Sequence, residues 1–206
     1  MSTNYPMVLS LEGKKVVVVG GGMVADRKVA GLLDSGATII VVSPDLTEGL
    51  GRLVGSGVIE WRKGLFTAED MENAFMVFAT TNDPELNQTI KRSAKPTQLV
   101  NIADDPDGSD FHVPARIQRG RLSITVSTGG ASPILAKKIR QDIEKDYDER
   151  YESYLDFLFD CRQWILSEVN DPGLKRKLLT AITEADYLEA EDRETKFKDM
   201  YKKINC

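Results

Sequence analysis

The sequence predicts an α/β fold, in which a parallel sheet with helices on both faces is followed by a β-hairpin and a helical C-terminal region. Three observations lead to this prediction. Four consecutive valines, residues 16–19, are typical of a strand buried on both faces. Over the first hundred residues, short apolar runs alternate with helical patterns, as in a doubly wound sheet. After Asp104 the alternation stops, and a hairpin pattern leads into helical periodicity.

A glycine-rich corner ends the first predicted strand at Gly20. Gly20, Gly22 and Ala25 match the G-x-G-x-x-G/A spacing of a dinucleotide-binding turn. The first glycine allows the tight turn, the second lets the backbone approach a pyrophosphate, and the third small residue lets helix and strand pack closely. The free N–H groups of the helix that opens at Met23 and Val24 suit phosphates. The corner predicts a Rossmann-type nucleotide site, and the alternative is a glycine-rich turn of another α/β protein.

The other elements of the first hundred residues follow from apolar runs, helical periodicity and local caps. The predicted strands are residues 15–20, 37–43, 58–62, 75–79 and 98–103, after a short lead-in strand within 8–14, and the predicted helices are residues 23–35, 46–57 and 85–94. Gly36 suits a left-handed cap after the first helix, and Pro84 suits the start of the third. Thr67 and Asp70 have the spacing of a capping box.

Polar residues follow the predicted strands at the edge where a parallel sheet binds its ligands. Such ligands lie beyond the carboxyl ends of the strands. This edge carries the turn Ser43-Pro44-Asp45 after the second strand, and Thr80 and Thr81 after the fourth. A ribose is commonly held by an acidic residue about 20 positions after the glycines. Ser43 or Asp45 takes that place here, so we expect these five residues at the cofactor, with NAD or NADP left open.

Asp104 closes the fifth predicted strand at the same edge. A dehydrogenation sends one hydrogen to a nicotinamide as hydride, and the other must leave as a proton to a nearby group. Asp104 is therefore the candidate catalytic base. The alternative is that Asp104 only caps a turn with Asp105 and Pro106.

After Asp104 the sequence predicts a hairpin and then helices. Residues 111–118 and 121–127 read as two strands, the second of which alternates apolar and polar side chains. Ser132 suits an N-cap, and Pro133 suits the first helical position. Helical periodicity then continues to a break at residues 170–173, after which two short helices are expected.

Basic residues gather in the hairpin and in the helix after it. They are Arg116, Arg119, Arg121, Lys137, Lys138 and Arg140. This cluster suits a polycarboxylate, with Arg116 and Lys137 as expected substrate contacts, and the alternative is a solvated cationic surface. Thr128 and Gly129 precede a helix whose backbone N–H groups suit an anion, so we expect substrate contacts there too, unless the segment is only a connector.

Composition and charge disfavour several other classes of function. A net charge of −5 argues against nonspecific nucleic-acid binding. No apolar run approaches the ~20 residues that span a bilayer, and no signal peptide is recognised, so no membrane partner is expected. The cysteines, Cys161 and Cys206, are too few for a disulfide framework, which indicates a reducing cytoplasm. With His112 as the one histidine, no metal site is expected.

Three motifs together resemble one family. They are Gly20-Gly21-Gly22-Met23-Val24-Ala25-Asp26-Arg27-Lys28, Asn101-Ile102-Ala103-Asp104-Asp105-Pro106 and Ser127-Thr128-Gly129-Gly130-Ala131-Ser132-Pro133. In order and spacing, the chain to about Lys145 is similar to the precorrin-2 dehydrogenase module of siroheme synthases. Two features depart from the family: Thr128 stands where serine is common, and from the length of the sequence we expect no methyltransferase domain like that of its largest members.

The resemblance implies NAD-dependent oxidation of precorrin-2 to sirohydrochlorin, on the route to siroheme. The substrate would be a large, flat tetrapyrrole with eight carboxylates. The resemblance also implies a homodimer in which the hairpin region exchanges contacts, and it assigns the role of general base to Asp104. On this basis the chain divides into a NAD-binding Rossmann domain at 1–113, a dimerisation region at 114–147 and a helical C-terminal domain at 148–206.

Two alternatives to a simple dehydrogenase stay open. In bifunctional members of the family, the aspartate matching Asp104 also serves metal insertion, so the chain could in addition act as a sirohydrochlorin ferrochelatase. One histidine and scattered carboxylates make a poor metal site, but transient metal contact needs no dedicated one. The second alternative is a non-catalytic NAD-sensing dimer, which would need no acid or base at Asp104.

Overall fold

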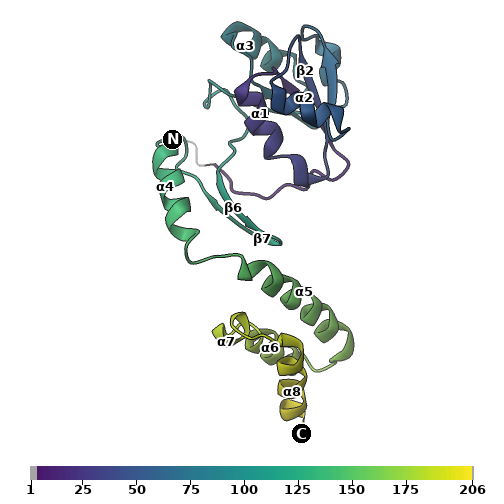
Figure 1. Cartoon of the computed structure of the whole chain (residues 1–206), viewed down its shortest axis with the longest axis vertical. Helices are drawn as coiled ribbons and strands as arrows, with labels where there is room; N and C mark the ends of the chain where they lie inside the picture. Colours follow the sequence, from purple (N-terminus) through teal and green to yellow (C-terminus); the bar gives the residue numbers. More distant parts are fainter. Residues whose placement is uncertain (1–3, 206) are drawn as a thin grey trace. The chain divides into compact units, whose positions relative to one another are not determined.

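The structure is a computed structural model that describes residues 4–205, so that Cys206 lies outside the described residues. The chain divides into two compact units, Met1–Val113 and Pro114–Cys206. Figure 1 shows both units and labels their helices and some of their strands. Within residues 4–205, no helix combines the length and the apolar composition that crossing a membrane requires.

The first unit is built on the parallel sheet that the sequence predicts. Its strands are β1 (Lys15–Val19), β2 (Thr38–Ser43), β3 (Glu60–Lys63), β4 (Met76–Ala79) and β5 (Leu99–Ile102), in the spatial order β3-β2-β1-β4-β5. β1 lies in the middle, with Val17 opposite Ile40 of β2 and Val77 of β4. The four valines of β1 are at most 2% exposed, as expected for a strand covered on both faces.

Helices cover both faces of this sheet (Figure 1). They are α1 (Met23–Ala30), α2 (Glu48–Gly55) and α3 (Pro84–Ser93), with short 3₁₀ turns η1 (Leu33–Ser35) and η2 (Ala68–Met71). Successive side chains of a strand point to opposite faces. Val16 and Val18 accordingly pack in one core with Val29 of α1, while Val17 and Val19 pack in a second core with Ile90 of α3.

The caps predicted from the sequence form, but two elements differ. Pro84 begins α3, Gly36 is left-handed with φ 72°, and Thr67 makes the capping box with Asp70. The helix expected over 23–35 is wrong in length, because α1 stops at Ala30 and only η1 follows.

The expected lead-in strand within residues 8–14 is also wrong. β1 already pairs with β2 on one edge and with β4 on the other, so no edge is left beside it. Residues 4–10 are exposed, and the segment is held instead by the Gly13 N–H, which donates to the Gly36 carbonyl at 2.9 Å.

The outer edge of β5 is covered by the loop that follows it. The Asp110 N–H donates to the Val100 carbonyl at 2.8 Å, and the Asn101 amide donates to the Phe111 carbonyl at 2.9 Å. The first of these bonds satisfies a backbone carbonyl of β5 that an open edge strand would expose, and the second attaches the loop to the strand. They also explain why the strand expected over 111–118 starts only at Ala115.

The second unit begins with the predicted hairpin. Strands β6 (Ala115–Arg119) and β7 (Leu122–Val126) pair antiparallel, with Ile117 opposite Ile124, around a turn in which Gly120 has φ 50°. Helix α4 (Pro133–Ile143) packs on both strands, and its N-cap Ser132 accepts a hydrogen bond from the Leu135 N–H. The hairpin and the cap therefore form as the sequence predicts.

The rest of the second unit is helical. It contains α5 (Arg150–Glu168), α6 (Pro172–Ala181), α7 (Ala185–Leu188) and α8 (Arg193–Asn205). Their core includes Tyr154, Cys161, Ile165, Leu178 and Phe197. A break follows α5 as expected, but it covers residues 169–171, because α6 already begins at Pro172; within the described residues three helices follow it rather than two. The extra boundary arises because the Asp192 carboxylate accepts from the Thr195 N–H and so restarts the chain as α8.

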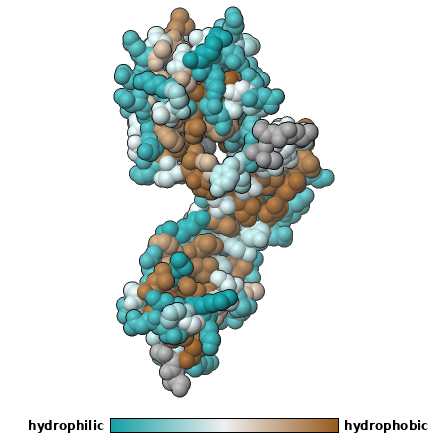
Figure 2. Space-filling model, turned by 180° about the vertical axis from the view of Figure 1, so that it is seen from behind, coloured by the Kyte–Doolittle hydropathy of each residue, from teal (hydrophilic) through white to brown (hydrophobic). Residues whose placement is uncertain are grey.

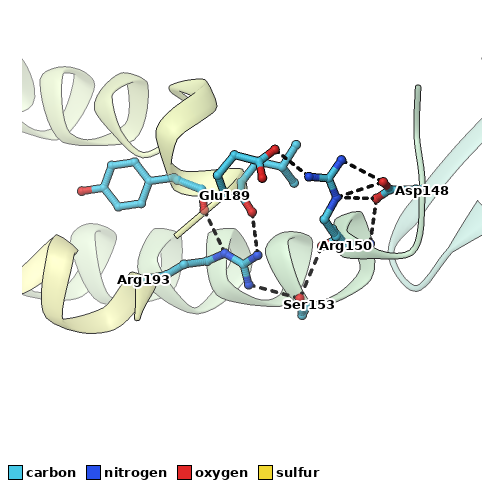
Figure 3. A network of polar contacts seen from close by, with 7 residues as sticks. Asp148, Arg150, Ser153, Glu189 and Arg193 are labelled. Carbon is cyan, nitrogen blue, oxygen red and sulfur yellow. Dashed lines mark hydrogen bonds and ion pairs between the residues drawn. The ribbon is translucent and has the colours of Figure 1, made fainter. Parts of the chain in front are cut away.

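Two arginines tie these helices together (Figure 3). Arg193 donates to the carbonyls of Tyr187 and Leu188 at 2.9 Å each, and to the Ser153 hydroxyl at 3.1 Å. It thereby satisfies the carbonyl groups that end α7. Arg150, at the start of α5, bridges the carboxylates of Asp148 and Glu189. α5 is in this way joined by polar contacts to the segment between α7 and α8.

The buried thiol in this helical core has an unusual pKa, which gives a test of the packing. Burial raises the pKa of Cys161 from its ordinary 9.0 to about 11, with a smaller contribution from the Asp160 and Glu194 carboxylates. Because the thiolate is the reactive form, alkylation of Cys161 at pH 8 should be about 100-fold slower in the folded protein than in urea. The rate is measured with iodoacetamide in a Cys206→Ser background. Equal rates in both states would contradict the packing described for α5 and α8.

Candidate active site

The strand order of the first unit reverses between β1 and β4, and the glycine corner follows β1 at that point. Ligands of open parallel sheets bind at such a switch point. Gly20 has φ 121°, and its N–H donates to the Val42 carbonyl at 2.9 Å. A Cβ at Gly20 would lie 2.7 Å from the Thr80 carbonyl oxygen, and the Thr80 hydroxyl donates to the Val19 carbonyl at 2.8 Å. The ends of β1, β2 and β4 therefore meet around this glycine.

The next two glycines differ in what surrounds them. A Cβ at Gly21 would lie 1.9 Å from the Asp45 carbonyl oxygen, so this position holds the turn after β2 against the corner. A Cβ at Gly22 would meet nothing within 4 Å. Gly22 is also the N-cap of α1, whose first N–H groups have no partner within the helix. Open space beside unpaired donors suits a pyrophosphate.

The start of α1 supports this arrangement. Met23 is exposed, Val24 is half-buried and Ala25 is fully buried. A larger side chain at position 25 would push α1 away from the sheet, so the small third residue of the motif has the expected packing role. The Asp26 carboxylate accepts from the Thr47 hydroxyl at 2.9 Å, which keeps this charge engaged at the N-cap of α2.

The turn after β2 places its three candidate residues differently. Ser43 is buried, and its hydroxyl donates to the Asp45 carbonyl at 2.6 Å. Its proton is thus used to close the turn. Pro44 and Asp45 are exposed, and no ion pair involves the Asp45 carboxylate within residues 4–205. Of the three, Asp45 offers the freest polar side chain.

The segment after β4 connects to Asp104 through Asn87, a residue that the sequence did not single out. The Thr81 N–H donates to Asn87 Oδ1 at 3.2 Å, and the Thr81 hydroxyl lies 2.7 Å from the same oxygen. Asn87 Nδ2 donates to Asp104 Oδ1 at 3.0 Å. Asn87 belongs to α3 and is 0% exposed. Thr80, Thr81 and Asp104 are therefore brought together at one edge of the sheet.

The neighbouring aspartates have different surroundings. Asp105 accepts from the Gly108 N–H at 2.9 Å through one oxygen and from Gln88 at 2.7 Å through the other. These hydrogen bonds, that of Gly108 first, lower the pKa of the Asp105 carboxyl. Asp104 is exposed, and among residues 4–205 only its Oδ1 has a hydrogen-bond partner. Asp105 thus holds the loop, whereas Asp104 keeps one oxygen available for chemistry.

The four expected substrate contacts belong to the second unit. Arg116 and Lys137 are exposed. The Thr128 hydroxyl accepts from the Ser132 N–H at 3.1 Å and lies 3.0 Å from the Ser132 carbonyl, so it closes the turn before α4. Gly129 has φ 59° and open space beside it.

Ion pairs divide the basic cluster of this unit. Arg119 and Arg140 both pair with Glu144, and Arg121 pairs with Asp156. Arg116, Lys137 and Lys138 have no ion pair among the residues that the structure describes. These three are the cations still available to an anionic ligand.

Two other features of the described residues bear on candidate sites: groups of metal-binding side chains and a cavity. Within the described part of the chain, no group of three His, Cys, Asp or Glu side chains is placed to hold a metal ion. A cavity of about 780 Å³ lies in the helical region, between α5 and α8. None of the residues predicted for cofactor, substrate or catalysis lines it.

Family models match the chain in three consecutive segments. A model described as "Putative NAD(P)-binding" matches residues 7–115. A model described as "Sirohaem biosynthesis protein central" matches residues 119–146, and one described as "SirC C-terminal domain" matches residues 151–196. The last model falls within the helical part of the second unit.

Known proteins are similar over most of the chain. A precorrin-2 dehydrogenase of Priestia megaterium is 38% identical over 183 residues, which covers 89% of this chain and 91% of that protein. A precorrin-2 dehydrogenase of Bacillus subtilis strain 168 is 35% identical, covering 77% of this chain and 98% of that protein. The solved structure of "SirC, precorrin-2 dehydrogenase" has a TM-score of 0.83 at 36% identity, covering 97% of this chain and 100% of that one.

The two inner glycines give a matched test of the corner. Gly21→Ala should destabilise the first unit by about 3 kcal/mol or more, because its Cβ would overlap the Asp45 carbonyl group. Gly22→Ala should change stability by less than about 1 kcal/mol, because its Cβ meets open space. The free energy of unfolding of each purified variant is measured in urea. Equal destabilisation by the two substitutions would contradict the geometry of the corner.

Proposed function

This chain belongs to the precorrin-2 dehydrogenase family, and from that premise we propose that it oxidises precorrin-2 to sirohydrochlorin with NAD, in siroheme biosynthesis. The observation that carries the proposal is the position of Asp104. It is an exposed carboxylate with a free oxygen, joined through Asn87 to the segment that follows β4 at the strand-order reversal.

The residues of the corner fit the cofactor. The open space at Gly22 and the unpaired N–H groups of Met23 and Val24 would hold the pyrophosphate, close to the tight turn at Gly20. The turn of Ser43, Pro44 and Asp45 would receive the adenine ribose, with the exposed Asp45 carboxylate accepting from its hydroxyls. A carboxylate there repels a 2′-phosphate, which favours NAD over NADP. Thr80 and Thr81 would border the nicotinamide half.

The reaction removes two electrons and two hydrogens from the substrate. When bound, NAD supplies an acceptor for one of these hydrogens as hydride. Asp104 accepts the other as a proton at Oδ2, because Oδ1 is held by the Asn87 amide. Since the side chain is exposed, the protonated Asp104 can pass this proton to water and return to its ionised form. Protein residues therefore need only bind the reactants and move one proton.

The substrate is a large anion, so it needs exposed cations. Arg116 and Lys137 would contact its carboxylates, since neither has an ion pair among the described residues. The backbone at Gly129, in a left-handed turn with open space, would approach a further carboxylate, and Thr128 fixes that turn.

We also propose that the chain forms a homodimer through the hairpin and α4. An isolated two-stranded hairpin is marginal in water, so it needs cover. α4 covers one face, but its own outer side carries Ile134, Leu135 and Ile139, exposed by 84%, 49% and 37%. Figure 2 shows hydrophobic surface over this part of the second unit. A second copy of the same element would cover it, with residues exchanged between subunits as the family resemblance implies.

Asp104→Asn tests the catalytic proposal. The variant should bind NAD within about threefold of the parent affinity, while turnover of precorrin-2 falls about 100-fold or more, as for loss of a general base. NADH absorbance reports turnover, and calorimetry reports NAD binding. Asp107→Asn, in the same exposed loop, is the matched control and should keep its activity. Full turnover by Asp104→Asn would refute the base, and no NADH from the unaltered protein would refute the function.

Ile134→Glu tests the dimer. A charge on the exposed side of α4 should shift the protein from dimer to monomer at about 10 µM, because burying an unpaired carboxylate is costly. Sedimentation velocity measures the mass, and circular dichroism checks that the helices remain. Leu65→Glu alters an apolar residue of the first unit with a similar exposure, 76% against 84%; it is the control and should stay dimeric. A variant that remains dimeric, or a parent protein that is monomeric, would contradict the proposed interface.

A further inference from the structure

Asn87 is a fully buried amide in a helix that otherwise buries apolar side chains against the sheet. It lies in α3, whose other fully buried residue is Ile90. Burying an amide is costly unless its hydrogen-bonding groups are satisfied. Its partners therefore indicate why an amide is needed at this position.

The contacts of Asn87 fix the orientation of its amide. Oδ1 accepts from the Thr81 N–H at 3.2 Å, and that group can only donate. Nδ2 donates to the Thr81 carbonyl at 3.2 Å and to Asp104 Oδ1 at 3.0 Å, and both of these can only accept. The opposite orientation would face oxygen against oxygen and donor against donor. The donor to Asp104 is therefore set by the backbone after β4.

We propose that Asn87 is a positioning residue for the dehydrogenation: it holds Asp104 through Oδ1 and couples that carboxylate to the Thr81 segment beside the cofactor. This inference rests on the function proposed above. The Asn87 amide leaves Oδ2 as the basic oxygen, and it fixes the carboxylate relative to the backbone that borders the nicotinamide half.

The neutral character of the donor matters chemically. A lysine or arginine at this distance would lower the pKa of a carboxylate by about 1–3 units and weaken it as a base. It would also attract the carboxylates of an anionic substrate to the wrong place. A neutral amide orients Asp104 without either effect, and its own position is secured by three contacts to Thr81.

If Asn87 had only a structural role, its hydrogen bonds to Thr81 would be sufficient. The three contacts to Thr81 already satisfy much of the buried amide, whereas Asp104 is exposed and could be solvated by water. The bond to Asp104 is thus the one that a structural role does not require. A test must therefore read out the ionisation of the base as well as the stability of the protein.

The test depends on the other charged groups of α3 and of the loop after β5. Asp105 is held by Gln88 of α3 and by the Gly108 N–H. Asp83 caps the first turn of α3 through its carboxylate, and Lys91, farther along α3, pairs with Asp110. Each of these charges is engaged in its own contact, so a charge introduced at position 87 acts most directly on Asp104.

Asn87→Asp is the decisive variant, because it is isosteric and keeps the acceptor to Thr81. It places a second carboxylate oxygen about 3 Å from Asp104 Oδ1, and two carboxylates so close share a proton. The acid limb of the kcat–pH profile should move up by about one unit or more, so that kcat measured on that limb falls about tenfold. KM for precorrin-2 and Kd for NAD should stay within about threefold. Gln88→Glu adds the same charge one residue later, beside Asp105, and should leave the acid limb within about 0.3 units.

Asn87→Ser adds no charge, and its shorter side chain places the hydroxyl too far from Asp104 to replace the amide donor. It should lower kcat about tenfold, and the loss should not add to that of Asp104→Asn in the double variant. Equal acid limbs for Asn87→Asp and Gln88→Glu, or additive losses, would overturn the inference while leaving the dehydrogenase proposal in place. If neither Asn87 variant folds, the role of Asn87 is structural and the inference is wrong. If the unaltered protein forms no NADH, it is the proposed function that fails.

Discussion

The organising constraint of the first unit is the absence of side chains at Gly20 and Gly21. A Cβ at either position would overlap the chain after β4 or the turn after β2, at 2.7 Å and 1.9 Å respectively. Because both positions are bare, the carboxyl ends of three neighbouring strands close onto one corner. Gly22 comes next and is free of such contacts. Gly20 and Gly21 therefore allow close backbone packing, whereas Gly22 leaves open space for a ligand.

Helices on both faces of the sheet contribute residues to this corner. α1 packs in the core with Val16 and Val18, and it presents its N-terminal N–H groups at the glycines. α3 packs in the opposite core with Val17 and Val19, and it carries Asn87 to Thr81 and Asp104. A central strand buried on both faces is what allows this division, since each face can support a helix whose first turn lies at the same edge. Cofactor binding and control of the carboxylate can therefore be set by different helices.

Local rules explain what the sequence could predict here. The valine strand, the caps at Ser132 and Pro84, and the glycine spacing each depend on residues near one another in the chain, and each forms. The lead-in strand failed because β1 has no free edge, which is a property of the whole sheet. Gly21 and Asn87 were missed for the same reason: their partners, Asp45 and Asp104, are distant in sequence. An amide in a helix carries no pattern that reveals which carboxylate it will meet.

The adjacent aspartates Asp104 and Asp105 follow the same strand but have different surroundings. Both carboxylate oxygens of Asp105 accept hydrogen bonds, one from Gln88 and one from the Gly108 N–H. These bonds lower the pKa of Asp105, which keeps the carboxylate ionised. Gly108 must lack a side chain for this, since a Cβ would lie 2.4 Å from the Asp105 carboxylate. Because the loop is already held by Asp105, Asp104 is not needed for capping. Asp104 is left with Oδ1 held by α3 through Asn87 and with Oδ2 free of hydrogen bonds to the described residues, as the proposed role of base requires.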